Sequence, residues 1–417
     1  MTGAPPRRGP RPLALHLALA LATRWAARTP PGFAPGSRSW SGAWPRSRQG
    51  RQEAARIAAA LAEGGHRPDQ FAIAVERALL ARDAALLRGI LAYRRHPFHR
   101  DLPEPPVLWT EGASRLLDYG GRPDARPLLV VPSLVNRSHI LDLLPEASML
   151  RFLAAGGARP LLLDWGEPGG AERGFTLTDY VTGRLERALA AAVGIAGGPV
   201  VLLGYCMGGL LGLALAQRRP APLRGLALLA TPWDFQAEDP ARARSLAATL
   251  PVLEPLLQRL GVLPVDALQA LFAAQDPGGI AEKFRHFGQL DPDSPQARRF
   301  VALEDWLNDG VALAAPVARE ALGGWYGENT PARGAWRIAG EAVDPAAIVL
   351  PAFLAIPARD RIVPPASALA LAGRMAGGLV HHPAAGHVGM VAGTAAKREL
   401  WRPLLSWIKA LPAAAGV

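Results

Sequence analysis

The chain has 417 residues, half of them hydrophobic, which is enough for one large α/β domain with an insertion or a second small domain. Its net charge of +11 is concentrated at one end, because residues 1–60 hold ten arginines and one glutamate and the remaining residues balance to only +2. The globular body is therefore not basic, and specific nucleic-acid recognition is not expected. The one cysteine excludes an internal disulfide and a cysteine-based metal site, and it fits a reducing compartment.

The N-terminal segment RRGPRPLALHLALALAT (residues 7–23) has a positive start and an apolar stretch over residues 13–22, as a secretory signal peptide does. His16 interrupts the apolar stretch, and basic, amphipathic character continues through TRWAAR (residues 23–28). We therefore expect an interfacial or docking helix rather than an exported leader. No apolar run reaches the ~18 residues of a transmembrane helix. Residues 1–60 are typical either of a solvated, Arg-rich extension or of a nonspecific surface for anionic partners.

Next in the chain, residues 51–95 predict two helices and HPFHRDLPEPP (residues 96–106) predicts a linker. From Pro127 onward, buried apolar runs alternate with helical stretches, including Leu177 to Val193 and Leu210 to Gln217. Strands buried on both faces and joined by helices are typical of a parallel, doubly wound sheet. The predicted strands lie at residues 127–132, 159–165, 199–205, 225–230, 350–357 and 378–383.

The stretch VVLLGYCMGGLLGLALA (residues 200–216) places Cys206 at a glycine-rich turn between a predicted strand and a predicted helix. This is the pattern of a nucleophile elbow, in which a strained turn projects the nucleophile above the sheet. Gly204 and Gly208 leave room for such a turn. A buried structural cysteine is the alternative, since free cysteine is among the most buried residue types, but the glycine-rich turn centred on Cys206 favours a nucleophile.

One connection is too long for the alternating pattern. Between Ala230 and Leu350 the sequence has helical periodicity, as in ARARSLAATLPVLEPLLQRLG and QARRFVALEDWLNDG. An insertion of this length between late strands predicts a helical cap, about residues 235–348, over the active-site edge. Together with the elbow, it predicts an α/β-hydrolase fold: a mostly parallel doubly wound sheet with a helical cap insertion and a helical N-terminal extension. We expect residues 1–104 to form the basic arm and helices and residues 105–417 the catalytic domain.

The acid of a catalytic triad in this fold lies between the nucleophile and the histidine in the chain. Asp360, in IPARDRIVPP, follows the strand predicted at residues 350–357 and precedes a proline-stiffened loop. Asp234, in TPWDF, follows the preceding strand and is the second candidate. We favour Asp360, because Asp234 is also typical of a helix cap or a turn.

The same chain order leaves three histidines as candidates for the base. His387 lies in the loop PAAGHVGM, where glycines on both sides let the loop approach the elbow, so His387 is favoured. His381 and His382 close the last predicted strand, and packing at the strand end explains them. His387 would accept the thiol proton, and its imidazolium would keep the thiolate populated near neutral pH.

An oxyanion hole is expected from the backbone N–H of Met207 and one N–H of the loop VPSLVNRS, donated by Val135 or Asn136.

A thiol that attacks a thioester exchanges one thioester for another, so the acyl group stays activated for attack by a hydroxyl group. The cysteine therefore favours acyl transfer from coenzyme A to an alcohol over cleavage of stable esters.

Six segments, in order between about residues 105 and 408, resemble the polyhydroxyalkanoate synthases, which form polyesters. They are PLLVVPSLVNRSHILDLLPEASMLRFL, LLLDWGEPG, LLGYCMGGLLGLALA, ALEDWLNDG, IPARDRIVPP and AAGHVGMVAG. The cysteine box alone is less specific, because dienelactone hydrolases also carry a Gly-x-Cys-x-Gly-Gly turn. LVNRSHILDL followed by DWG, together with the large cap, is much more specific.

This resemblance implies a cytoplasmic enzyme, associated with polymer granules, that transfers (R)-3-hydroxyacyl groups from coenzyme A to a growing poly(3-hydroxybutyrate)-type polyester. Cys206 would hold the acyl group, His387 would deprotonate the thiol, and Asp360 would activate the attacking 3-hydroxyl or orient the histidine. The resemblance implies no metal and no redox cofactor, since the coenzyme A thioester is a substrate. It also implies a homodimer contact through the cap, and some members of the family need a separate partner subunit.

Three residues depart from the family pattern: Ser138 and His139 stand where bulky aromatic residues are frequent, and Arg361 follows the acid where histidine is common. The alternative function is hydrolysis by the same fold, as an intracellular depolymerase or an acyl-CoA thioesterase, with water as acyl acceptor. A structural protein of granules or membranes is a third hypothesis, which the intact set of candidate catalytic residues argues against. The concentration of positive charge in residues 1–60 predicts that this segment favours association with granules or membranes over catalysis.

Overall fold

The computed structural model describes residues 7–28, 47–122, 124–274 and 276–412, and the chain divides into two compact units. The helical unit comprises Met1–Phe98 with Gln269–Asn308, and the sheet unit comprises His99–Leu268 with Asp309–Val417. This division differs from the predicted boundary at residues 104 and 105, and it assigns part of the predicted cap to the helical unit. No helix within the described residues is both long enough and apolar enough to cross a lipid bilayer.

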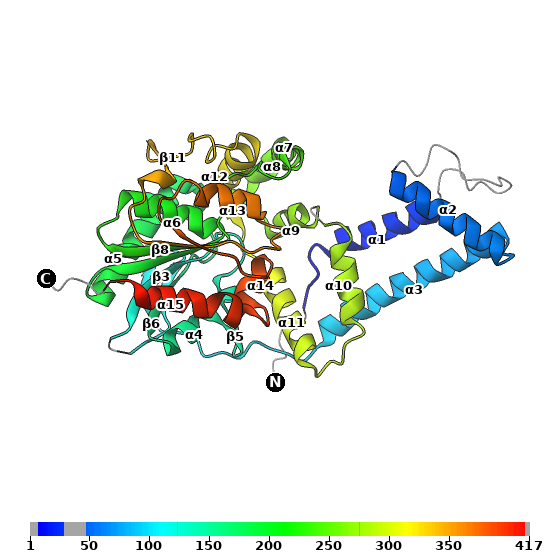
Figure 1. Ribbon diagram of the computed structural model, residues 1–417, viewed down its shortest axis with the longest axis horizontal. Coiled ribbons are helices and arrows are strands. Elements are labelled where there is room, and N and C mark those ends of the chain that lie inside the picture. The colour runs from blue at the N-terminus through cyan, green and yellow to red at the C-terminus, as the bar shows by residue number, and fades with distance from the viewer. Residues whose placement is uncertain (1–6, 29–46, 123, 275, 413–417) are drawn as a thin grey trace. The chain divides into compact units, whose positions relative to one another are not determined.

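The sheet unit is built on an eight-stranded sheet with the order β1-β2-β6-β3-β7-β8-β13-β14 (Figure 1). β2 pairs antiparallel with β1 and with β6, and every pair from β6 to β14 is parallel. All six predicted strands belong to this sheet, which confirms the mostly parallel, doubly wound arrangement. The strands are β1 (Val107–Glu111), β2 (Ser114–Asp118), β3 (Arg126–Val131), β6 (Ala158–Asp164), β7 (Val200–Tyr205), β8 (Leu223–Leu229), β13 (Ala352–Ala355) and β14 (Leu379–His381).

The central strands are buried on both faces because helices cover the sheet. Every residue of β7 is buried, as is every residue of helix α6 (Met207–Arg218) up to Ala216. Figure 1 shows α6 and α15 (Arg402–Ala410) on opposite faces of the sheet. β1 and β2 were not predicted from the sequence. Both strands are short and partly exposed, so they lack the continuous apolar run that indicates a buried strand.

Further helices of the sheet unit flank the strands or belong to the predicted cap. The helices that flank the strands are α4 (Met149–Ala155), α5 (Glu186–Ala196), α13 (Pro365–Ala372) and α14 (His387–Ala392). Cap elements in this unit are α7 (Pro240–Ala247), α8 (Leu250–Leu260), α12 (Ala315–Arg319) and the π-helical segment η4 (Glu320–Gly327). Helix α9 (Val265–Ala273) spans the boundary between the two units.

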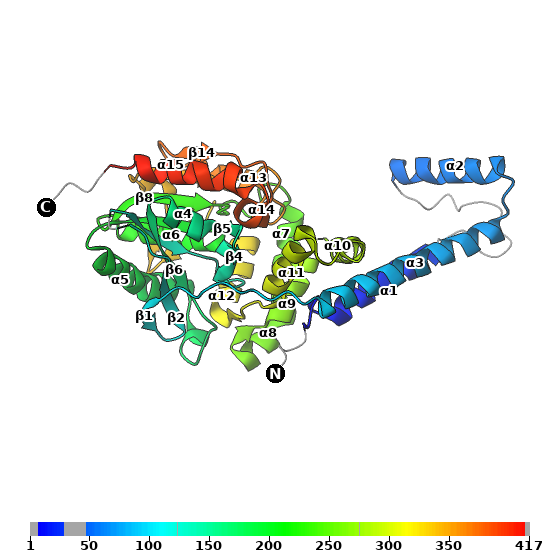
Figure 2. The ribbon, with the colours of Figure 1, turned by 90° about the horizontal axis from the view of Figure 1, so that it is seen from below.

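The helical unit holds α1 (Leu13–Arg28), α2 (Arg48–Glu63) and α3 (Pro68–Arg95), together with α10 (Gly279–Phe287) and α11 (Pro295–Asn308) (Figure 2). The two helices predicted within residues 51–95 are confirmed as α2 and α3. Side chains of α3 and α10 share an apolar cluster, so α10 groups with the N-terminal helices rather than with the rest of the cap. The buried members of this cluster are Leu86, Ile90, Tyr93, Phe284, Phe287, Ala297 and Val301.

Residues just before α1 are anchored to α11. The Arg7 Nε donates to Asp305 Oδ1 at 2.7 Å, and the Arg11 backbone N–H donates to Asn308 Oδ1 at 2.8 Å. Burial lowers the pKa of His16, whose Nε2 lies 3.1 Å from the Arg11 carbonyl oxygen. This part of the Arg-rich segment is thus a packed portion of the helical unit and not a solvated extension. Residues 29–46, which the sequence also predicts as part of the basic arm, lie outside the described residues.

Candidate active site

Cys206 occupies the sharp turn between β7 and α6. Its backbone has φ +56° and ψ −125°, a left-handed conformation that costs a non-glycine residue ~1–3 kcal/mol. The Cys206 N–H donates to the Leu229 carbonyl of the neighbouring strand β8 at 2.8 Å, which fixes the turn to the sheet. The Cys206 side chain is partly exposed. The geometry is that of a nucleophile elbow, as predicted, because the turn is held under strain with the thiol at its tip.

Three glycines allow this turn to form. A Cβ at Gly208 would lie 2.2 Å from the Val131 carbonyl oxygen, and a Cβ at Gly204 would lie 2.5 Å from the Cα of Gly209. The predicted need for space at Gly204 and Gly208 is therefore confirmed. Gly209 is equally constrained, since its Cβ would lie 1.9 Å from Thr231 Oγ1.

Asp360 and His387 meet at the carboxyl ends of β13 and β14. Asp360 Oδ1 accepts the backbone N–H groups of Ile362 at 2.8 Å and Val363 at 2.9 Å. Its Oδ2 lies 2.7 Å from His387 Nδ1, and the Asp360 side chain is fully buried. One carboxylate oxygen is thus fixed by the backbone, which leaves the other to orient the imidazole ring.

The protonation of His387 depends on the charges around it. Burial lowers its pKa, but the negative charge of Cys206 and hydrogen bonds to Asp360 and Cys206 outweigh burial and raise the pKa to about 10. The imidazolium is therefore the form that His387 takes beside a thiolate near neutral pH. This is the charge state in which a cysteine is a nucleophile.

The other candidates for acid and base have different partners. Asp234 Oδ1 accepts the Gln236 backbone N–H at 2.9 Å and the Asn329 side-chain amide at 2.8 Å, so Asp234 serves as a turn residue and a link to the cap. His381 Nε2 contacts the Glu399 carbonyl oxygen, and His382 is exposed. Of the candidates weighed from the sequence, Asp360 and His387 are the ones that the structure brings together.

The predicted oxyanion donors lie at the elbow and on the loop after β3, residues 132–137. Met207 is the first residue of α6, so its N–H has no acceptor within the helix. The Val135 N–H donates to Ser133 Oγ at 3.0 Å. The next residue, Asn136, has a left-handed backbone with φ +65°. The Val135 N–H is therefore already engaged within its own loop, which favours Asn136 of the two candidates.

Further aromatic and amide side chains, which the sequence did not predict, interact with the candidate site residues directly or through one another. Burial and the negative charge of Cys206 raise the pKa of Tyr326, a residue of the cap, to about 12. The ring of Phe235 packs edge-on against Tyr326, with centroids 4.9 Å apart, and the Phe235 N–H donates to Asn329 Oδ1 at 3.1 Å. Tyr205 OH donates to the His387 carbonyl oxygen at 3.3 Å. Tyr205 directly precedes Cys206 in the glycine-rich turn, whereas no linear motif marks Phe235, Tyr326 and Asn329.

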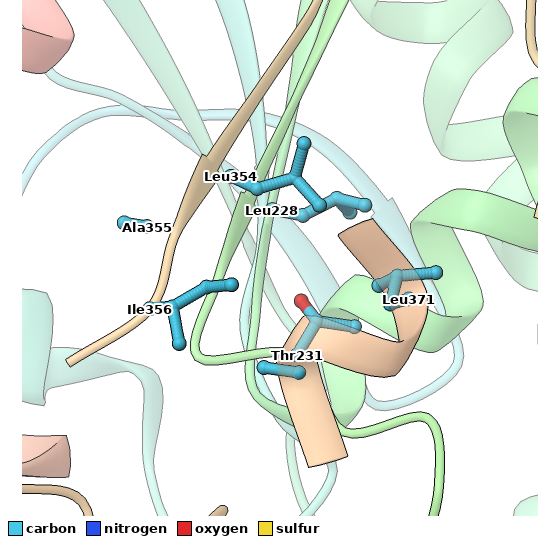
Figure 3. A pocket seen from close by; sticks show the side chains of 7 residues that line it. Leu228, Thr231, Leu354, Ala355, Ile356 and Leu371 are labelled. Atoms are coloured by element: carbon cyan, nitrogen blue, oxygen red, sulfur yellow. The ribbon is translucent and has the colours of Figure 1, made fainter. Parts of the chain in front are cut away.

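A small, mostly aliphatic pocket lies behind the elbow, between the ends of β8 and β13 and helix α13 (Figure 3). Figure 3 shows the Thr231 hydroxyl among the side chains that line it, and within the described residues this hydroxyl has no hydrogen-bond partner. Ile356 and Ala368 line the pocket and also belong to the cluster that packs against Cys206. The pocket is thus part of the packing that supports the thiol. In the described residues, no group of three His, Cys, Asp or Glu side chains is arranged to hold a metal ion.

Comparisons with known proteins find several that are similar to this chain. The chain is 28% identical over 309 residues to the poly(3-hydroxyalkanoate) polymerase subunit PhaC of Haloferax mediterranei, over 72% of this chain and 63% of that protein. It is 29% identical over 296 residues to the protein of the same name from Allochromatium vinosum, over 69% of this chain and 82% of that protein. Among solved structures, an alpha/beta hydrolase fold protein from Nakamurella multipartita has 19% sequence identity and a TM-score of 0.45, covering 74% of this chain and 99% of that one.

These relatives confirm the resemblance to polyhydroxyalkanoate synthases predicted from the sequence motifs. The chain spans less than two thirds of the length of the Haloferax protein. A family model for the alpha/beta hydrolase fold matches residues 126–393, which include the sheet from β3 to β14, the elbow and the pair of Asp360 and His387. The chain belongs to the α/β-hydrolase fold family.

Proposed function

We propose that this chain is an acyltransferase that polymerises (R)-3-hydroxyacyl groups from coenzyme A thioesters into a polyhydroxyalkanoate, with release of coenzyme A. The observation that carries the proposal is a cysteine at the elbow, with a histidine whose pKa is raised by that thiolate and by Asp360. The names of the sequence relatives, poly(3-hydroxyalkanoate) polymerase subunits, supply the substrate class. The thiol suits this chemistry because its acyl derivative is itself a thioester.

In the first step, the Cys206 thiolate attacks the thioester carbonyl carbon and a carbon–sulfur bond forms. The carbonyl electrons move to the oxygen, which accepts hydrogen bonds from the backbone N–H groups of Met207 and Asn136. As the carbonyl re-forms, the bond to the sulfur of coenzyme A breaks, and that sulfur takes the proton of the His387 imidazolium. The products are acyl-Cys206, free coenzyme A and neutral His387.

In the second step, neutral His387 accepts the proton of an attacking 3-hydroxyl group while its oxygen bonds to the acyl carbon. The bond to Cys206 breaks, and the thiolate and imidazolium are restored as a pair. An oxygen ester replaces a thioester, which makes the transfer favourable. The contact between Nδ1 of His387 and Asp360 supports an orienting role for the carboxylate, because it leaves Nε2 for proton transfer. Each step uses groups of this chain, so the mechanism calls for no metal and no redox cofactor.

The experiment measures coenzyme A release from (R)-3-hydroxybutyryl-CoA and identifies the acyl product in the same tube. Release with insoluble polyester supports the synthase, and Cys206→Ala must abolish it. Release with only free 3-hydroxybutyrate supports the alternative, a thiol hydrolase of the same fold, a depolymerase or thioesterase that passes the acyl group to water. Release that survives Cys206→Ala contradicts both functions. A longer 3-hydroxyacyl-CoA serves as a second substrate, because chain-length preference is independent of the mechanism.

The proposal extends to partners and location. The relatives carry the word subunit in their names. We propose that this chain works either as a homodimer through its cap or with a separate partner subunit. We also propose that it acts at the surface of polymer granules in the cytoplasm. Sedimentation of the active protein tests the dimer, since a strictly monomeric and fully active protein contradicts it. Fractionation of polymer-producing cells tests the granule association.

A further inference from the structure

Arg137 lies beside the proposed oxyanion donor Asn136 and bridges two carboxylates. Its Nε donates to Asp309 Oδ2 at 2.8 Å, and its Nη2 donates to Glu167 Oε1 at 2.9 Å. Asp309 lies in the segment after α11, and Glu167 lies in the loop after β6, so one guanidinium ties the loop after β3 to two other segments. All three residues belong to the sheet unit.

A second contact holds the same loop from the same side. A Cβ placed on Gly310 would lie 3.2 Å from Asn136 Oδ1, so the Asn136 side chain rests directly on the residue that follows Asp309. Asn136 therefore contacts Gly310, and the next residue, Arg137, contacts Asp309, which directly precedes Gly310. At its other end the loop is fixed against α6, because Gly208 has no room for a Cβ beside Val131 and Pro132.

The ion pairs themselves contribute little to stability. The side chains of Glu167 and Asp309 are 61% and 60% exposed, and that of Arg137 is 31% exposed. Solvent screens pairs of such exposure, so each adds little to the free energy of folding. Their effect is instead geometric, because they hold the loop that contains Asn136, a left-handed residue and the proposed oxyanion donor. A displacement of ~1 Å in such a group can cost ~100-fold in rate.

We propose that Arg137 is a positioning residue: its guanidinium, held by Asp309 and Glu167, sets the direction of the Asn136 N–H toward the oxygen of an acyl group on Cys206. The inference rests on the proposed thiol acyl transfer and deepens it. Arg137 acts through Asn136 and touches no reacting atom in this role. It makes the segment after α11 a support for the oxyanion hole.

The test compares two reactions of Cys206 in the full chain. Acylation by p-nitrophenyl butyrate passes through an oxyanion and is followed as a burst of p-nitrophenol, whereas alkylation by iodoacetamide has no oxyanion. Arg137→Gln is expected to slow the burst by ~10-fold or more and to leave alkylation within ~2-fold, because only the first reaction uses the Asn136 N–H. Arg137→Lys is expected to recover part of the burst rate. Asp309→Asn combined with Arg137→Gln is expected to cost no more than Arg137→Gln alone, since the two residues act together.

Arg374→Gln is the matched control, because Arg374 makes an exposed ion pair with Asp344 at 3.1 Å in the same unit. It is expected to change neither reaction. An unchanged burst in Arg137→Gln, or equal slowing of burst and alkylation, overturns the inference. If the wild-type protein gives no burst, both the inference on Arg137 and the proposed acyl-Cys206 intermediate are overturned. A wild-type burst without coenzyme A release from (R)-3-hydroxybutyryl-CoA refutes the proposed function alone, and the comparison of variants then still decides the role of Arg137.

Discussion

His387 Nδ1 lies 2.7 Å from Asp360 Oδ2, in a pair where the carboxylate is fully buried and the imidazole nearly so. The backbone N–H groups of Ile362 and Val363 fix the second carboxylate oxygen, so the imidazole ring has one preferred direction. The proposed chemistry depends on this direction, because the same ring nitrogen gives a proton to the sulfur of coenzyme A and takes one from the attacking 3-hydroxyl group.

Asp360→Asn is expected to lower the rate of coenzyme A release by ~100-fold or more, because an amide neither holds the imidazolium nor favours the required tautomer. Asp234→Asn is the matched control, since Asp234 was the second candidate for the acid and contacts Gln236 and Asn329 instead. Rates are compared at saturating substrate, with folding checked by thermal unfolding. A larger loss in Asp234→Asn than in Asp360→Asn contradicts the assignment.

The raised pKa of His387 predicts how stability changes with pH. In the folded protein the pKa is about 10, against an ordinary value of 6.5, so between these values the folded state holds a proton that the unfolded state has released. The contribution of His387 is therefore complete below pH 6.5 and is lost as pH rises toward about 10. The free energy of unfolding of the wild type, minus that of His387→Gln, is expected to fall over this range.

Cys206→Ala provides the control for that pH dependence. The thiolate is the largest of the causes that raise the pKa of His387, so its removal is expected to shift the loss of stability to lower pH. Chemical denaturation at a series of pH values measures both effects. A difference between wild type and His387→Gln that stays constant with pH would falsify the ion pair.

Sequence reasoning locates the elbow because its constraints are local. Cys206 needs small neighbours at fixed positions before and after it, and Gly204, Gly208 and Gly209 are visible in a stretch of six residues. Asp360 is found for a similar reason, since a position directly after a buried strand brings a side chain to the active edge of a parallel sheet.

The rest of the site depends on contacts between residues distant in the chain. Asn329 reaches Asp234 across 95 positions, and Arg137 reaches Asp309 across 172. Neither pair has a spacing that a helix or strand imposes, so periodicity gives no sign of them. The same holds for Arg7, which was predicted as part of the basic arm, because its partner Asp305 lies 298 positions away.

The glycines of α6 provide a stability test on one helix. Gly208→Ala is expected to destabilise the protein, because its Cβ would lie 2.2 Å from the Val131 carbonyl oxygen and the backbone would have to move. Gly212→Ala, in the same helix, places its Cβ at 3.6 Å from Leu202 Cδ2, an ordinary contact. Alanine is favoured over glycine in a helix by ~1 kcal/mol, so Gly212→Ala is expected to be neutral or stabilising. Equal effects of the two substitutions on the unfolding midpoint would refute this account of the elbow.

The role of the N-terminal charge is best tested on α2. Deletion of residues 1–60 removes Arg7 and Arg11, which bind Asp305 and Asn308, and so disturbs the helical unit itself. Helix α2 has no buried residue, so its arginines can be changed without loss of packing.

Arg48→Gln combined with Arg56→Gln is expected to weaken binding to anionic vesicles and to isolated polymer granules at low salt. Each arginine near an anionic surface contributes ~1 kcal/mol, and added salt reduces that contribution. Coenzyme A release in solution is expected to stay unchanged, because the candidate catalytic residues all belong to the sheet unit. Arg7→Gln is the comparison: it is expected to lower the unfolding midpoint, since the Arg7 guanidinium donates to Asp305 and to the carbonyl groups of His96 and Phe98. Unchanged vesicle and granule binding in the α2 variant would show that the basic charge of this helix does not direct the protein to surfaces.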